Sequence, residues 1–140
     1  MLMISCSSGP KENQQNEEPA QTSTPEIASA EKEGENLYLR YCMACHQTNG
    51  SGVPGMYPPL INSPTVNSGK KEEFIKILLN GLKGPIEIHG KKYNQTMPSQ
   101  SFLTDEELAK IINYVSKSFN NKGPEVSPAD VKALRTSSTQ

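Results

Sequence analysis

The stretch Cys42-Met43-Ala44-Cys45-His46 decides which kind of fold this chain has. Its two cysteines are three residues apart, so on a helix end their thiols lie on one face, one turn apart. A histidine follows directly. This pattern is typical of covalent haem attachment. The thiols add to the two vinyl groups of one haem, and His46 is then held beneath the iron as the proximal ligand.

Two other kinds of site share the cysteine spacing. A thioredoxin-like dithiol follows a strand and opens a helix, whereas here the motif closes a predicted helix and enters a glycine-rich loop. A structural zinc site needs four ligands, and outside the motif the chain offers only Cys6 and His89. The sequence therefore favours haem over both.

Apolar residues recur at helical spacing in three segments, which predict helices over about 30–45, 70–80 and 104–119. Ser29 is the expected N-cap of the first helix. Gly34 lies inside it at a cost of about 1 kcal/mol relative to alanine, which suggests that another backbone approaches closely.

The third helix has the clearest start signal. Thr104 and Glu107 form a capping box, and Leu103 and Leu108 occupy the positions of a hydrophobic staple. A short fourth helix is expected to start at Ser127-Pro128, with serine as cap and proline at the first helical position.

The segments between these helices, 47–69 and 84–101, are rich in Gly, Pro, Asn and Ser, and only 86–90 could form a turn of ribbon. Long loops inside a small domain usually serve a function or wrap around something. We therefore expect an all-α fold, with three main helices and long loops wrapped around one covalently bound haem.

Composition divides the 140-residue chain into four parts. Residues 1–6 are interpreted as a residual lipoprotein signal that ends at Cys6, the expected lipidation site. Residues 7–29 are almost entirely polar or small, which predicts a disordered tether. The folded domain is expected over 30–136, with a flexible tail at 137–140.

Charge excludes one class of partner. The net charge is −1, and no basic run interleaves with aromatic residues, so we expect no binding to nucleic acid. No run of about 20 apolar residues could span a membrane. Membrane association is therefore expected only through a lipid on Cys6.

The chain resembles the class I cytochrome c family over about residues 31–136. The resemblance rests on Gly34-x-x-Leu37-Tyr38-x-x-x-Cys42-x-x-Cys45-His46, Gly50-x-Gly52-x-Pro54, Pro58-Pro-Leu60 and Met97-Pro98. The ending, through Val126-Ser-Pro-Ala-Asp-Val131, is similar to a bacterial branch of the family. That branch usually has Trp-Gly-Asn where this chain has Phe119-Asn-Asn121.

The resemblance implies further roles at the haem. Met97 would be the distal iron ligand, and the Pro58 carbonyl would accept a hydrogen bond from His46 and fix its tautomer. Met56 follows His46 by only ten residues, whereas Met97 follows a helix and a second loop, enough chain to reach the other haem face. His89 is the competitor for distal ligand, although a lone histidine in a polar turn is typical of an exposed site.

Packing roles are implied as well. Gly34 and Tyr38 would contact the last helix of the family fold, against Ile111 and Tyr114. The haem would be buried by Leu60, Phe74, Leu78 and Leu103.

The resemblance implies a mono-haem c-type cytochrome with His/Met ligation that carries single electrons in a respiratory chain and is not an enzyme. The alternative is a haem-based sensor or a peroxidase-like enzyme with a labile distal methionine. Lys83, Lys91 and Lys92 are expected to form a basic rim that steers towards acidic partners.

The expected partners are a terminal oxidase, a nitrogen-oxide reductase or a periplasmic dehydrogenase. The protein is expected to be a monomer on the periplasmic side of a bacterial membrane, lipid-anchored there through Cys6.

Overall fold

A computed structural model describes residues 25–137 of the chain. The predicted signal with Cys6, residues 7–24 of the predicted tether and residues 138–140 of the predicted tail lie outside the described residues.

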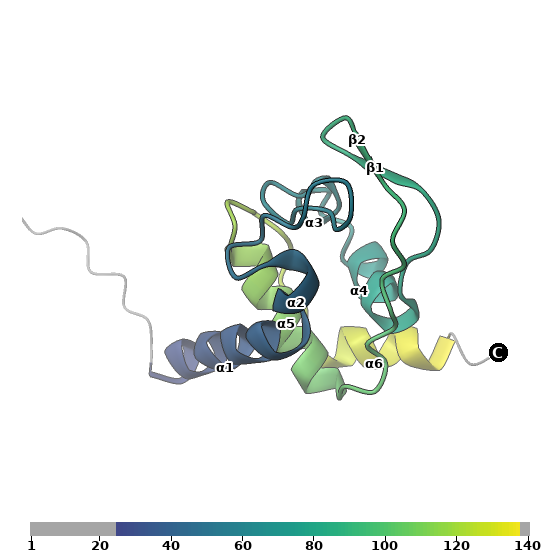
Figure 1. Ribbon diagram of the computed structural model, residues 1–140. Helices are drawn as coiled ribbons and strands as arrows, with labels where there is room; N and C mark the ends of the chain where they lie inside the picture. Colours follow the sequence, from purple (N-terminus) through teal and green to yellow (C-terminus); the bar gives the residue numbers. More distant parts are fainter. Residues whose placement is uncertain (1–24, 138–140) are drawn as a thin grey trace, which may run out of the picture.

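The described residues form an all-α fold with one small hairpin, which confirms the predicted fold class (Figure 1). The helices are α1 (Pro25–Tyr41), α2 (Met43–His46), α3 (Pro64–Asn67), α4 (Lys71–Asn80), α5 (Asp105–Lys117) and α6 (Pro128–Ser137). Strands β1 (Ile86–Ile88) and β2 (Lys91–Tyr93) pair antiparallel, with Ile86 opposite Tyr93. This hairpin lies where the sequence allowed a turn of ribbon.

The crossing of α1 and α5 lies at the base of the molecule (Figure 1). Tyr38 is fully buried there, with its ring 5.4 Å from that of Tyr114 and 5.2 Å from that of Phe119. A Cβ on Gly34 would lie 2.5 Å from the Lys110 carbonyl oxygen and 3.0 Å from Tyr114 Cβ. The expected close approach of a second backbone at Gly34, and its contact with Tyr114, are confirmed.

The first helix differs from the prediction at both ends. It begins at Pro25, so residues 25–29, predicted as the end of the disordered tether, are helical, and Ser29 lies inside the helix and is not its N-cap. Proline suits a first helical turn, because its missing N–H would have no partner there. The predicted single helix is also interrupted at Cys42, which caps the separate turn α2. Its backbone still bonds to both sides, from Cys42 N to Tyr38 O at 2.8 Å and from His46 N to Cys42 O at 2.9 Å.

The last predicted long helix, α5, has its capping box, with Thr104 and Glu107 bonded reciprocally. It ends at Lys117, two residues before the predicted end. Phe119 and Asn120 have φ angles of 55° and 58°, which are left-handed and cannot continue the helix. The reversal turns the Phe119 ring back onto the α1–α5 crossing.

Serine–proline pairs start two of the short helices. Ser127 caps α6 as predicted, accepting a bond from Asp130 N at 3.2 Å. Ser63 does the same for α3, accepting from Val66 N at 3.4 Å. The helix α3 lies in the segment 47–69, which was predicted to be irregular, so that prediction was wrong at this turn.

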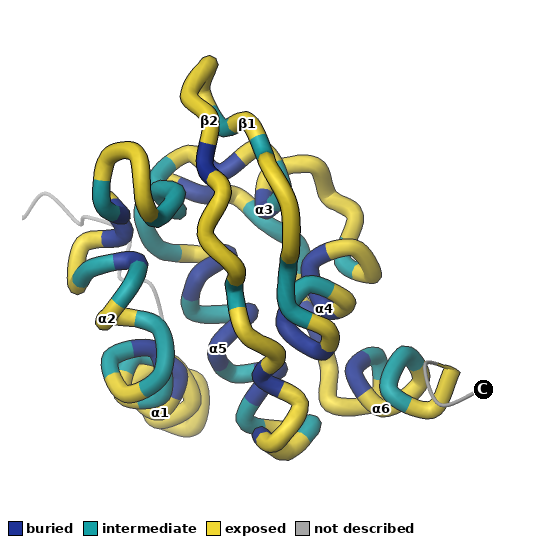
Figure 2. Tube along the Cα trace, turned by 45° about the vertical axis from the view of Figure 1, so that its right-hand side comes forward, coloured by how far each residue is buried: buried dark blue, intermediate teal, exposed yellow. Residues whose placement is uncertain are grey.

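The core lies between α1, α4 and α5, and the hairpin stands at the opposite end of the molecule. Figure 2 shows buried residues along the facing sides of these helices, whereas the hairpin is mostly exposed or half-buried. Its buried member is Tyr93, at 5% exposure. Among residues 25–137, no helix combines the length and apolar character needed to cross a membrane.

Candidate haem site

An apolar cleft opens between α2 with the loop that follows it on one side, and α4 with the hairpin on the other. Four residues predicted for haem binding line it: Cys42, His46, Pro58 and Met97. Its apolar lining includes Leu60, Val66, Phe74, Ile77, Leu78, Ile86, Ile88, Ile111 and Val115.

His46 is buried at 9% exposure, and its Nδ1 lies 2.9 Å from the Pro58 carbonyl oxygen. A carbonyl oxygen only accepts hydrogen bonds, so Nδ1 carries the proton and Nε2 keeps its lone pair when the ring is neutral. Burial lowers the pKa of His46 below its ordinary value, while the bond to Pro58 opposes that shift. The ring is therefore held neutral, in the tautomer that a metal ligand needs.

The loop that brings Pro58 to His46 depends on Gly52. Its N–H donates to the His46 carbonyl at 3.0 Å, and its φ is 63°. A Cβ there would collide with the backbone at Tyr57 and Pro58. Only glycine permits this close and left-handed approach.

The two motif cysteines are half-buried and not joined in a disulfide. Cys42 lines the cleft, whereas Cys45 lies one turn further on in α2 and is not part of the lining. Burial, and then the neighbouring Cys45, raise the pKa of the Cys42 thiol to about 11. In the chain itself this sulfur is therefore a protonated thiol at neutral pH.

Met97 enters the cleft from the segment that follows the hairpin. Its backbone is held on both sides by Leu82, with Met97 N to Leu82 O at 2.9 Å and Leu82 N to Met97 O at 3.0 Å. Gly81 permits this pairing, since a Cβ there would collide with the Met97 carbonyl. The methionine is thus fixed to the end of α4.

The residues that could replace Met97 as the distal iron ligand lie outside the cleft. Met56 is 45% exposed and does not line the cleft. His89 occupies the hairpin turn, exposed, with its Nε2 3.2 Å from the Ile61 carbonyl oxygen. Within 25–137, no group of three or more His, Cys, Asp or Glu side chains could hold a metal ion, which leaves the zinc alternative without support in the described part.

The apolar lining differs from the prediction in part. Leu60, Phe74 and Leu78 line the cleft, but Leu103 packs in the helical core and does not. Sequence reasoning missed Ile86 and Ile88, which reach the cleft from β1. The two isoleucines alternate with the exposed Glu87, which is the period-two pattern of a half-buried strand. This pattern could have predicted that both face the interior.

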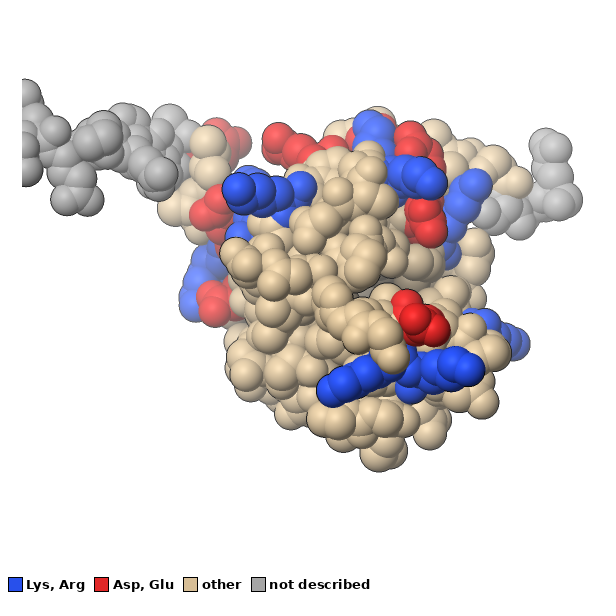
Figure 3. Space-filling view, turned by 90° about the horizontal axis from the view of Figure 1, so that it is seen from above, with Lys and Arg blue, Asp and Glu red and all other residues tan. Residues whose placement is uncertain are grey.

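The three lysines predicted to form a basic rim are all exposed. Lys92 faces Glu87 across the hairpin, so the rim includes an opposite charge. Figure 3 looks down on the hairpin end and shows basic side chains beside an acidic one, with uncharged surface around them. Steering by this rim stays a prediction.

Comparison with known proteins identifies the class. A family model for cytochrome c matches residues 31–119, and the chain belongs to the cytochrome c family. It therefore takes haem c, covalently bound and with iron, and serves in electron transfer. The cleft fits this cofactor, because its lining is apolar and a buried neutral histidine offers Nε2 beside a cysteine of the attachment motif.

The sequence is also similar to individual proteins of this family. Two proteins named cytochrome c-552 from Thermus thermophilus are each 39% identical, over 98 and 92 residues. These matches cover 68% and 64% of this chain, and 66% and 70% of the relatives. The cytochrome c subunit of a quinone alcohol dehydrogenase from Gluconobacter oxydans is 31% identical over 106 residues, which are 74% of this chain and 22% of that subunit.

Proposed function

We propose that the chain is a mono-haem cytochrome with His/Met axial ligation that carries single electrons. Cys42 and Cys45 would hold the haem by thioether bonds, with His46 and Met97 as the axial ligands. The observation that carries the proposal is that His46 and Met97 line the same apolar cleft, while Met56 and the other histidine lie outside it.

The haem iron would supply the one-electron chemistry, and the chain would fix the positions of its ligands. The Pro58 carbonyl fixes the His46 ring, and the pairing with Leu82 fixes the backbone of Met97. With His46 and Met97 both bound to it, the iron would have no free coordination site for an exogenous ligand. A methionine ligand raises the reduction potential, and the apolar lining of the cleft would further disfavour the more highly charged oxidised state.

The alternative, a sensor or peroxidase-like enzyme, requires Met97 to leave the iron readily. The two backbone bonds to Leu82 oppose any movement of the Met97 backbone that would carry its sulfur away from the iron. We therefore propose an electron carrier rather than a catalyst. Carbon monoxide binding by the reduced wild-type protein distinguishes the two.

Partners and location form a further part of the proposal. Relatives include cytochrome subunits of a quinone alcohol dehydrogenase and of a fructose dehydrogenase, which favours exchange with a dehydrogenase on the periplasmic side of a bacterial membrane. A terminal oxidase or nitrogen-oxide reductase would be the partner at the other end. We propose a monomer, held at the membrane by a lipid on Cys6. Replacement of Cys6 by serine in the native host should then move the protein from the membrane to the soluble fraction.

Two methionine variants test the axial assignment. Met97→Ala should bind carbon monoxide in the reduced state at neutral pH, because it leaves one axial position open. Met56→Ala, the matched control, should resemble the wild type and bind none. Carbon monoxide binding by the wild type would favour the sensor or enzyme alternative. If Met97→Ala does not bind carbon monoxide, Met97 is not the distal ligand.

Covalent attachment is tested separately. The double variant Cys42→Ala/Cys45→Ala should lose the haem stain on a denaturing gel, whereas His89→Ala should keep it. Stain retained by the double variant would contradict the attachment site.

A further inference from the structure

The last helix, α6, lies beyond residues 31–119 that match the family model. It is nonetheless packed against both α4 and α5. Val131 is fully buried in the core, and Asp130 forms an ion pair with Lys71 of α4 at 2.8 Å. The helix is therefore an integral part of the domain.

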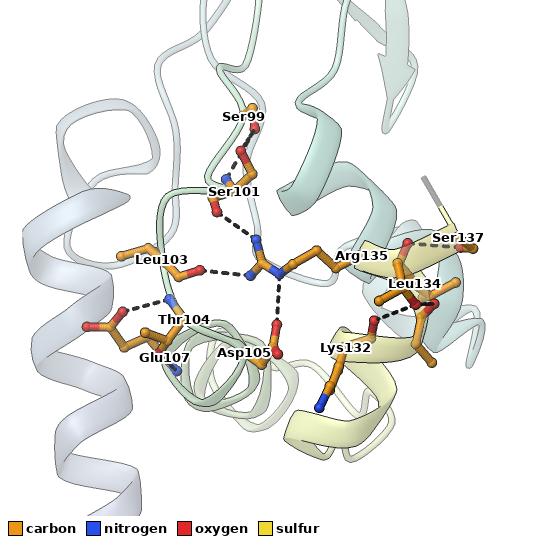
Figure 4. A network of polar contacts seen from close by, with 12 residues as sticks. Ser99, Ser101, Leu103, Thr104, Asp105, Glu107, Lys132, Leu134, Arg135 and Ser137 are labelled. Atoms are coloured by element: carbon orange, nitrogen blue, oxygen red, sulfur yellow. Dashed lines mark hydrogen bonds and ion pairs between the residues drawn. The ribbon is translucent and has the colours of Figure 1, made fainter. Parts of the chain in front are cut away.

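Arg135, near the end of α6, reaches the segment that joins Met97 to α5 (Figure 4). Its Nε donates to an Asp105 carboxylate oxygen at 2.8 Å. Its two terminal nitrogens donate to the backbone carbonyls of Ser101 at 2.6 Å and Leu103 at 2.8 Å. One rigid guanidinium fork thus holds three acceptors in fixed relative positions.

The braced segment, 98–104, has no helix or strand of its own. Its first half is tied to α4 by Ser99 Oγ to the Leu79 carbonyl at 2.5 Å and by Gln100 N to the Leu78 carbonyl at 2.7 Å. Its second half is tied to α6 by Arg135. Movement of the Met97 backbone away from the cleft requires this short segment to shift, because the two are continuous in the chain.

We propose that Arg135 is a positioning residue that keeps Met97 at the haem by bracing the segment 98–104. The proposal rests on the axial role of Met97 given above. Without the guanidinium, the Ser101 and Leu103 carbonyls lose charged donors, and the segment gains freedom to move. Displacement of Met97 by an external ligand then becomes easier, with no change in any residue that lines the cleft.

The test is a titration of the oxidised holoprotein with imidazole, followed by the loss of the weak near-infrared band of methionine–iron charge transfer. Arg135→Gln should bind imidazole about tenfold more tightly than the wild type, the factor expected from loss of about one hydrogen bond to a charged group. The matched control is Asp130→Asn. It removes the charge that pairs α6 with Lys71 of α4, and it removes none of the atoms that bond Arg135 to 98–104. It should bind imidazole as the wild type does.

Each outcome has one meaning. Unchanged imidazole affinity in Arg135→Gln would overturn the proposal. Equal gains in the two variants would overturn it as well, since they would report general loosening of α6. If the wild type lacks the near-infrared band, the axial assignment of Met97 itself fails, and that result is distinct from a failure of Arg135.

Discussion

Gly34→Ala adds one methyl group at the crossing of α1 and α5. The new Cβ would lie 2.5 Å from the Lys110 carbonyl oxygen, about 0.9 Å closer than the 3.4 Å at which ordinary contact begins. The neighbour is backbone, so relief requires the two helices to separate and the packing of Tyr38 to change. The substitution therefore tests whether this crossing is as close as the structure has it.

The magnitude follows from two opposing effects. Overpacking costs about 1–3 kcal/mol, and contact with backbone places this site at the upper end. Alanine recovers about 1 kcal/mol of helix propensity. We expect a net loss of about 2 kcal/mol, or a fall in melting temperature of about 8 °C.

Urea unfolding of the holoprotein, followed by the haem absorption band, measures this loss. Asn36→Ala on the exposed side of α1 is the control and should be neutral or slightly stabilising. A Gly34→Ala protein as stable as the wild type, with an unchanged denaturant slope, would refute the close crossing.

Three further predictions concern other contacts. Tyr38→Phe removes the hydroxyl that donates to the Gln47 carbonyl at 2.6 Å, so unfolding free energy should fall by about 1–2 kcal/mol, and an unchanged value would count against that bond. The bond from Lys71, together with the bonds from Ser127, lowers the pKa of Asp130 from 3.8 to about 2, so the contribution of these bonds to stability is complete above about pH 4 and is lost as pH falls towards 2. The difference in melting temperature between wild type and Asp130→Asn should shrink over that window, and a constant difference would contradict the pairing. Ile88→Ser opens the apolar lining to water, so the midpoint potential in voltammetry should fall by on the order of tens of millivolts, and a rise would contradict the role of the lining.

Features of the fold that depend on neighbouring residues were predictable. The capping box at Thr104 and the serine–proline start of α6 use atoms within one helical turn, so the pattern alone specifies them. The same signal at Ser63-Pro64 was present but lay in a loop rich in turn residues. The attachment motif is equally local, which is why haem could be inferred from five residues.

Features that depend on distant contacts were not predictable from periodicity. Phe119 continues the helical spacing of α5, yet its left-handed φ lets the ring pack on Tyr38 and Tyr114 instead. Leu103 and Ile86 have similar hydrophobicity, and only the course of the chain decides which of them lines the cleft. Arg135 had no local signal at all, because its acceptors lie about thirty residues earlier in the chain.

The proposed electron carrier depends on His46 and Met97 binding one iron between them. A visible–near-infrared spectrum of the oxidised wild-type holoprotein at neutral pH tests it most directly. We expect the weak near-infrared charge-transfer band of a methionine sulfur bound to ferric haem, lost in Met97→Ala and kept in Met56→Ala. A wild-type spectrum without that band would contradict it.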